Sequence, residues 1–111
     1  MATIIKQSRE FTKQEQYKLI VDDTSVSFTK AEGMIISPIA WVEYTDTNMD
    51  GKMVDVLAVL DEDGEVYSTI SDVFKRHFWQ IVDLMEGEPF AIRVIAGESK
   101  NGRKFVSCKL A

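Results

Sequence analysis

The order of strand and turn signals is the feature that most constrains how this chain folds. Three dipeptides, Asp50-Gly51, Asp63-Gly64 and Asn101-Gly102, each separate runs of apolar and β-branched residues. Such dipeptides between such runs are the strongest short-range signal for a β-hairpin. One amphipathic segment, Ser71 to Met85, interrupts the series before the last two runs. From Gly33 onward the sequence therefore predicts three strands, a helix and two further strands.

The expected helix begins at Ser71, which is a good N-cap, and ends at Gly87 and Pro89. Its apolar residues fall on one helical stripe. Within the expected strand 52–60, the residues Val54, Val56, Ala58 and Leu60 are expected to face inward. Pro38 is expected to mark an edge or a bulge in the strand before it. The expected strands are 17–21, 34–45, 52–60, 65–70, 90–96 and 105–110, with a turn at 22–25.

A helix between the third and fourth strands of a five-stranded β domain is the chain order of an OB-fold. We therefore predict an all-β domain with one helix, a five-stranded Greek-key barrel over residues 16–111. Residues 1–15 are expected to form a flexible N-terminal arm or a leading strand. OB-folds often bind single-stranded nucleic acid, but a fold does not fix a function, so the function must be argued from individual residues.

The composition fits one domain with one core in 111 residues. The single cysteine, Cys108, excludes an intramolecular disulfide and favours a reducing compartment. No apolar run approaches the roughly 20 residues that span a bilayer, and the first residues lack a secretory pattern. We expect a cytoplasmic protein with no membrane partner.

The charge is unevenly distributed along the chain. The whole chain carries −5, and Asp46 to Asp72 contains eight acidic residues and one basic residue, a net charge of −7. Glu86 to Ala111 contains five basic and three acidic residues, a net charge of +2. One part of the surface is thus acidic and another mildly basic, although ordinary scatter over a solvated surface would give the same pattern.

The residues needed for catalysis are missing. His77 is the only histidine and flanks the apolar stripe of the expected helix, where a partly buried or surface side chain is the expected role. Cys108 alternates with Val106 and Leu110, which predicts that it points inward. No second Cys or His completes a zinc site, and the acidic run 61–63 lacks the spacing of a calcium loop. We expect no enzyme activity, no metal and no cofactor.

The residues needed to bind a single strand are present: aromatic rings for bases and cations for phosphates. If Val106, Cys108 and Leu110 are core residues, Phe105 faces outward on the last strand, unless the N-terminal arm covers it. On the strand 34–45, Trp41 and Tyr44 lie on opposite faces, so at most one of them faces outward without a bulge.

Cations cluster near the last hairpin. Lys100, Arg103 and Lys104 surround the turn that joins the last two strands, one of the loops by which OB domains hold a ligand. Arg93 lies opposite Ile92 and Val94 on the preceding strand, and the alternative for the turn is a plain solvated hairpin. Lys18 and Lys52 complete the cations that we predict to bind nucleic acid.

Two segments resemble one known family. Residues 60–71, LDEDGEVYSTIS, are similar to the D-G-x-x-Y-S-x-I-S signature of the small single-stranded-DNA-binding proteins of protein-primed tailed phages. Residues 97–107, GESKNGRKFVS, are similar to that family's closing segment, a G-x-S-x-x-G turn before an aromatic strand. The likeness extends from about residue 16 to the end, and it is looser before residue 42.

The resemblance implies an OB-fold and a cooperative, sequence-tolerant coat that protects single strands during viral DNA replication or recombination, in the host cytoplasm. It adds Tyr67 as a candidate for base stacking, although a core tyrosine is the alternative. The partners that we expect are single-stranded DNA, a second copy placed head-to-tail along it, and replication proteins. The competing hypothesis is a small OB-like protein-interaction module that does not bind nucleic acid.

Overall fold

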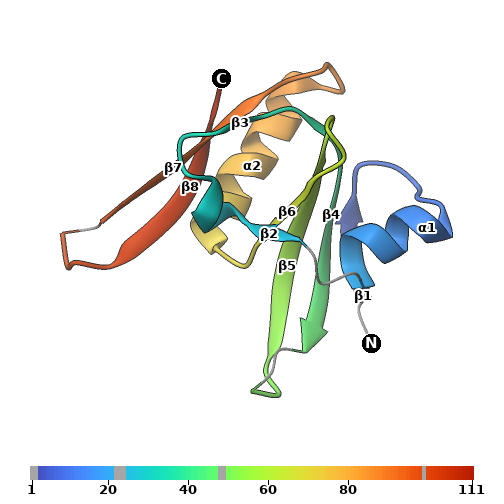
Figure 1. The fold of residues 1–111 in the computed structure, drawn as a ribbon, viewed down its shortest axis with the longest axis horizontal. Coiled ribbons are helices and arrows are strands. Elements are labelled where there is room, and N and C mark those ends of the chain that lie inside the picture. The colour runs from blue at the N-terminus through green and yellow to red at the C-terminus, as the bar shows by residue number, and fades with distance from the viewer. Residues whose placement is uncertain (1–2, 22–24, 48–49, 99) are drawn as a thin grey trace.

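The computed structural model describes residues 3–21, 25–47, 50–98 and 100–111, and it is mostly β structure with two α-helices (Figure 1). Three of the four residues of the turn expected at 22–25 lie outside the described residues. None of the described helices is long and apolar enough to cross a bilayer. The strands are β1 (Thr3–Gln7), β2 (Val26–Ser27), β3 (Ile35–Ile36), β4 (Pro38–Thr47), β5 (Met53–Asp61), β6 (Val66–Thr69), β7 (Ile92–Glu98) and β8 (Lys104–Leu110). The helices are α1 (Lys13–Gln16), the π-helix η1 (Tyr17–Val21), the 3₁₀ helix η2 (Phe28–Ala31) and α2 (Asp72–Met85).

The strands form two sheets, and the chain passes from one to the other where β3 leads into β4. The larger sheet has the order β1-β4-β5-β6-β2, and the smaller has the order β3-β7-β8. β3 runs into β4 with only Ser37 between them, and the register against β5 shifts between Pro38 and Ala40. The Asp61 carboxylate accepts a hydrogen bond of 2.8 Å from the Ser37 backbone N–H at this break. This shift confirms the irregularity predicted at Pro38. Its physical cause is that proline has no N–H to donate to the ladder.

The expected barrel is not closed. Within the described ranges, no strand pairing joins β8 to β6 or β2. The Ser71 hydroxyl instead bridges this opening by donating a hydrogen bond of 3.3 Å to the Val106 carbonyl. The principal helix does lie where it was expected, between the strands predicted at 65–70 and 90–96, now β6 and β7. The expectation of one helix is wrong, since α1, η1 and η2 add further helical turns.

The segment Tyr17–Val21 is helical, so the strand predicted there is wrong. Thr12 begins this helical stretch with a capping box, in which its hydroxyl accepts from the Glu15 N–H and the Glu15 carboxylate accepts from the Thr12 N–H. Leu19 is buried while Tyr17 and Val21 are 58% and 66% exposed. A strand would have placed all three on one face, so burial of Leu19 alone fits helical geometry.

Helix α2 covers one face of the larger sheet, as its apolar stripe predicts. Its N-cap, Ser71, accepts a hydrogen bond of 3.2 Å from the Phe74 N–H. Phe74 and Phe78 are fully buried in a core that includes Leu57 and Val59 of β5. The helix ends at Met85, and the next residue adopts a left-handed conformation with φ +49°.

Strand β5 is buried on both faces, which corrects the expected inward face. Leu57 and Val59 point to the core under α2, while Ala58 packs with Leu19 of η1 in a second cluster on the other face. The face carrying Val54, Val56, Ala58 and Leu60 therefore meets η1 and not the main core. A nearly continuous apolar run from residue 56 to 60 is the signal for such two-sided burial.

The β7–β8 hairpin follows the expected turn at Asn101-Gly102, where Gly102 has φ +76°. Val106 and Cys108 are buried as predicted, and burial raises the pKa of the Cys108 thiol to about 12. Leu110 is 46% exposed, so its predicted burial is wrong. The hairpin projects away from the larger sheet, at the end of the molecule opposite to α1 and β1 (Figure 1).

Candidate nucleic-acid interface

The sheet β3-β7-β8 has one buried face and one partly exposed face. The buried face presents Ile36, Ile92, Val94, Val106 and Cys108 to the core. The other face, called the outer face below, carries their neighbours in register: Ile35 beside Arg93 and Lys109, then Ile95 opposite the buried Ser107, then Gly97 opposite Phe105. Strand alternation thus gathers apolar, aromatic and cationic side chains on one surface.

Phe105 lies toward the hairpin end of the outer face and is 40% exposed. Its ring lies on Gly97: a Cβ at that glycine would stand 3.0 Å from the ring Cζ and 3.2 Å from Cε1. Glycine here allows the ring to lie against the backbone of β7, an aromatic–glycine pair known from other sheets. β1 and α1 lie at the other end of the molecule, so the N-terminal arm does not cover this ring (Figure 1). The outward orientation predicted for Phe105 is confirmed.

Two cations of the outer face lie directly opposite each other. Arg93 on β7 pairs in register with Lys109 on β8, and both side chains are exposed. Like charges on directly opposite residues destabilise a sheet. A bound polyanion would reverse this cost, because each phosphate would neutralise part of the repulsion. Lys109 was not among the predicted binding residues, although its alternation with Cys108 placed it on the face of Phe105.

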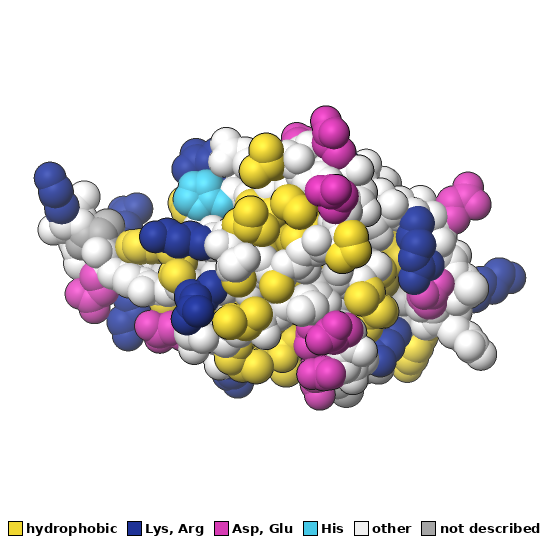
Figure 2. Space-filling model, turned by 90° about the horizontal axis from the view of Figure 1, so that it is seen from above, with side chains coloured by type: hydrophobic (Ala, Val, Ile, Leu, Met, Phe, Trp, Pro, Cys, Tyr) yellow, Lys and Arg dark blue, Asp and Glu magenta, His cyan; other side chains and the backbone are white. Residues whose placement is uncertain are grey.

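The turn of the hairpin extends this positive region. Lys100 and Arg103 are exposed residues of the segment that joins β7 to β8. Figure 2 shows more Lys and Arg side chains toward the left end of the molecule, where the hairpin lies, than at the right end, while acidic side chains lie mostly over the middle and right. The uneven distribution of charge expected from the sequence is therefore present on this face of the fold.

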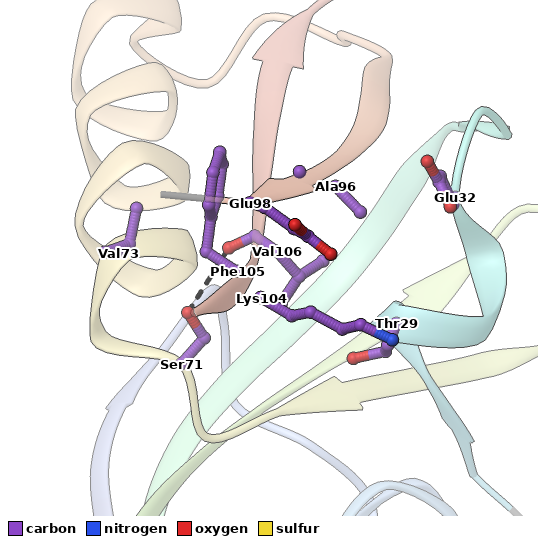
Figure 3. A pocket seen from close by; sticks show the side chains of 10 residues that line it. Thr29, Glu32, Ser71, Val73, Ala96, Glu98, Lys104, Phe105 and Val106 are labelled. Carbon is purple, nitrogen blue, oxygen red and sulfur yellow. Dashed lines mark hydrogen bonds between the residues drawn. The ribbon is translucent and has the colours of Figure 1, made fainter. Parts of the chain in front are cut away.

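Lys104 belongs to the other face of the hairpin. It pairs in register with Glu98, and its side chain extends toward Thr29 of η2 (Figure 3). Consecutive strand residues point to opposite faces, so Lys104 and Phe105 cannot share the outer face. Its predicted contact with a phosphate remains a prediction, now assigned to a separate surface.

The remaining predicted cations lie elsewhere. The Lys18 Nζ is 3.6 Å from the place that a Cβ on Gly64 would occupy, beside the acidic turn between β5 and β6. Lys52 follows the turn between β4 and β5, which points away from the hairpin (Figure 1). The structure does not bring either of them to the outer face, and their role in binding stays a prediction.

The other predicted stacking residues are wholly or partly buried. Trp41 makes edge contacts with Phe78 and Phe90, at centroid distances of 5.6 and 5.5 Å. Tyr44 and Tyr67 are only 7% and 5% exposed, and burial is the main cause that raises the pKa of both phenols. Trp41 and Tyr44 do lie on opposite faces of β4, as predicted. In this conformation Tyr44 and Tyr67 offer no open ring face to a base, while Trp41 is partly buried.

Helix α2 covers the middle of the outer face at Ser107. His77 of α2 forms a hydrogen bond through Nδ1 with the hydroxyl of Ser107, which is buried on β8. This bond fixes the helix against the strand that carries Phe105 and Lys109. His77 is partly buried, as its position beside the apolar stripe predicted.

The acidic turn is not arranged as a metal site in the described part of the chain, where no group of three or more His, Cys, Asp or Glu side chains could hold an ion. Asp61 is 6% exposed, and its carboxylate is engaged by the Ser37 N–H. This carboxylate therefore has a structural role at the β3–β4 break.

Comparison with known proteins places the chain in a family. The model of the family described as phage single-stranded DNA-binding protein matches residues 21–111. The chain belongs to this family. The single-stranded DNA-binding proteins of Bacillus phage PZA and Bacillus phage phi29 are each 31% identical to it over 86 residues, covering 72% of this chain and 69% of each relative. No solved structure matches the chain significantly.

Proposed function

We propose that this protein binds single-stranded DNA across the outer face of the β3-β7-β8 sheet, as a non-catalytic coat in phage DNA replication. The observation that carries the proposal is the exposed ring of Phe105 on the same face as the Arg93–Lys109 pair. Membership of the phage single-stranded DNA-binding protein family supports the same ligand. The protein would act in the host cell, on strands exposed while the viral genome is copied.

The chemistry of this face favours single strands over duplex. Arg93 and Lys109, with Lys100 and Arg103 at the turn, would contact phosphates, which every sequence offers alike. Phe105 would stack on a base, and a base in a duplex has no free face to offer. A protein that binds single strands but not duplex lowers the stability of the duplex by mass action. The same contacts therefore explain protection of single strands and removal of their secondary structure.

We also propose that the fold is an open form of the OB arrangement. β3 belongs to the smaller sheet and β4 to the larger, and they are nearly continuous. If the two are counted as one bent strand, the strand order is β6, β5, β4/β3, β7, β8. OB domains are partly open Greek-key barrels that bind oligonucleotides on strands 2 and 3 and on two loops. Here the matching face of β5 is covered by Leu19, which is why we place the DNA on β7 and β8 instead.

The competing hypothesis is a protein-interaction module. The net charge of −5 and the exposure of Ile35 and Leu110 on the smaller sheet favour it. Salt separates the two hypotheses, because contacts to phosphate release counterions and weaken steeply as salt rises. A mainly apolar protein interface lacks that dependence.

The double substitution Arg93→Ala with Lys109→Ala tests the proposed surface. Loss of two phosphate contacts should weaken binding of all sequences alike and flatten the slope of log K against log salt by about 1.4. The matched control removes Lys13 of α1, at the far end of the molecule, and should leave the slope unchanged (Figure 1). A double variant with wild-type affinity and slope would exclude the outer face as the DNA surface.

A further inference from the structure

A cleft of about 610 Å³ lies between the β7–β8 hairpin, the 3₁₀ helix η2 and the start of α2 (Figure 3). It occupies the opening at which β8 does not pair with β6. Pockets of about 300–1,000 Å³ hold small organic ligands, and a nucleobase lies well within that range. The cleft is lined by Thr29, Glu32, Ser71, Val73, Ala96, Gly97, Glu98, Lys104, Phe105 and Val106.

The cleft combines an apolar floor with charged walls. Ala96 and Val106 lie opposite each other in register and form part of the floor. Glu98 and Lys104 are the next opposite pair, and Figure 3 shows their side chains directed to the η2 side of the hairpin, where Glu32 also lies. Among the described residues, no hydrogen bond or ion pair engages the side chains of Glu98, Lys104 or Glu32. Their charged groups are therefore available to a ligand.

We propose that this cleft receives one base of the bound strand and favours a base with an exocyclic amine over uracil or thymine. This inference rests on the proposed binding of single-stranded DNA. Phe105 belongs both to the outer face and to the lining of the cleft. A base stacked on Phe105 therefore places the neighbouring nucleotide at the mouth of the cleft, where the Lys104 ammonium reaches the phosphate between the two.

The preference follows from the two carboxylates. An ionised carboxylate can only accept hydrogen bonds. The amine of cytosine is a donor that Glu or Asp accepts from in base recognition, whereas uracil and thymine present a carbonyl oxygen at the same position. That oxygen would face Glu98 or Glu32 as a second acceptor, without a proton between them. Amine-bearing bases gain a hydrogen bond in the cleft, and the others meet repulsion.

Oligo(dC) and oligo(dU) of equal length provide the cleanest test, because both are methyl-free pyrimidines that differ in the amine or carbonyl at this position. Titrations at pH 8 and one fixed salt concentration should show oligo(dC) bound about fivefold more tightly. Glu98→Gln should bring the ratio close to one, because the amide can both donate and accept. Glu32→Gln should lower the ratio in the same direction.

The matched control is Glu10→Gln, which removes the same charge at an exposed position just before α1. It should strengthen both complexes alike and leave the ratio unchanged, because it reduces only the general repulsion of DNA. Equal affinity of the wild-type protein for the two oligonucleotides, or a ratio that Glu98→Gln does not change, would overturn the inference and leave the proposed function intact. Failure to bind either oligonucleotide would overturn both.

Discussion

Phe105 is the residue whose exposure most needs a functional reason. Phe105 is 40% exposed, and the far end of its ring lies close to Gly97. The neighbouring positions Val106 and Cys108 of the same strand are buried, so β8 also offers positions at which a side chain packs into the core. An exposed ring held rigidly beside cations is what base stacking requires.

Phe105→Ala should therefore weaken binding of single-stranded DNA by about 1–3 kcal/mol while the protein stays folded. Leu110→Ala is the matched control, since this side chain is 46% exposed on the same strand but points to the other face. Affinities of the two variants are compared by fluorescence titration, with circular dichroism to confirm folding. Undiminished affinity of a folded Phe105→Ala protein would remove the ring from the interface.

Individual residues differ in how far the sequence predicts them. The alternation of side chains along β8 correctly places Phe105 outside and Cys108 inside. This prediction needs only the sequence of that one strand. The burial of Trp41 and Tyr44 could not be predicted in this way. Trp41 is covered by Phe78 and Phe90, and Tyr44 packs in the cluster of Leu19, so each is covered by a segment distant in sequence.

At the scale of elements, Ser71 connects helix α2 to strand β8. Its hydroxyl accepts from the Phe74 N–H and donates to the Val106 carbonyl, so one side chain caps the helix and bridges the open edge of β8. Helix α2 in turn supports the strand that carries Phe105, through His77 and Ser107. The position of the hairpin thus depends on this junction.

Ser71→Ala should lower the free energy of unfolding by about 1–2 kcal/mol, measured by urea denaturation, because it removes the N-cap. Ser71→Asp separates the two roles. Its carboxylate can cap the helix but cannot donate to the Val106 carbonyl, so it should restore part of the loss. If Ser71→Ala unfolds at the wild-type urea concentration, the junction does not stabilise the fold.

Elements with strong local signals are predicted well, and the others are not. Helix α2 has a cap and an apolar stripe, and the β7–β8 hairpin has Asn101-Gly102, so both follow from the sequence. Tyr17–Val21 is rich in residues that favour strands, yet the capping box at Thr12 and Glu15 begins a helical stretch that continues through it. The long-range pairing of β3 with β7, which builds the outer face, carries no local signal at all.

At the scale of the whole molecule, charge separation suggests how copies assemble on DNA. Exposed acidic residues Glu62, Asp63 and Glu65 lie around the β5–β6 turn, and the cations lie on the hairpin. We propose a weak head-to-tail contact between the acidic turn of one copy and the basic hairpin of the next. Sharing one strand raises the effective concentration of the two copies, so the contact would act mainly on DNA.

The free protein should then be a monomer or a weak dimer at micromolar concentration, and binding to long single strands should be cooperative. Analytical ultracentrifugation measures the first, and a binding isotherm on long single strands measures the second. Reversal of charge at Glu62 and Asp63 should reduce cooperativity more than it changes affinity for a short oligonucleotide. A stable tetramer in solution, or a non-cooperative isotherm, would contradict this assembly.

Titration of one mixed-sequence oligonucleotide, as a single strand and as a duplex of equal length, at several salt concentrations tests the central claim most directly. The account predicts far tighter binding of the single strand, and a log K that falls linearly with log salt. The slope should be about −0.7 for each phosphate contacted, hence about −2.8 if Arg93, Lys100, Arg103 and Lys109 all take part. Equal affinity for the two forms, or binding that does not change with salt, would contradict it.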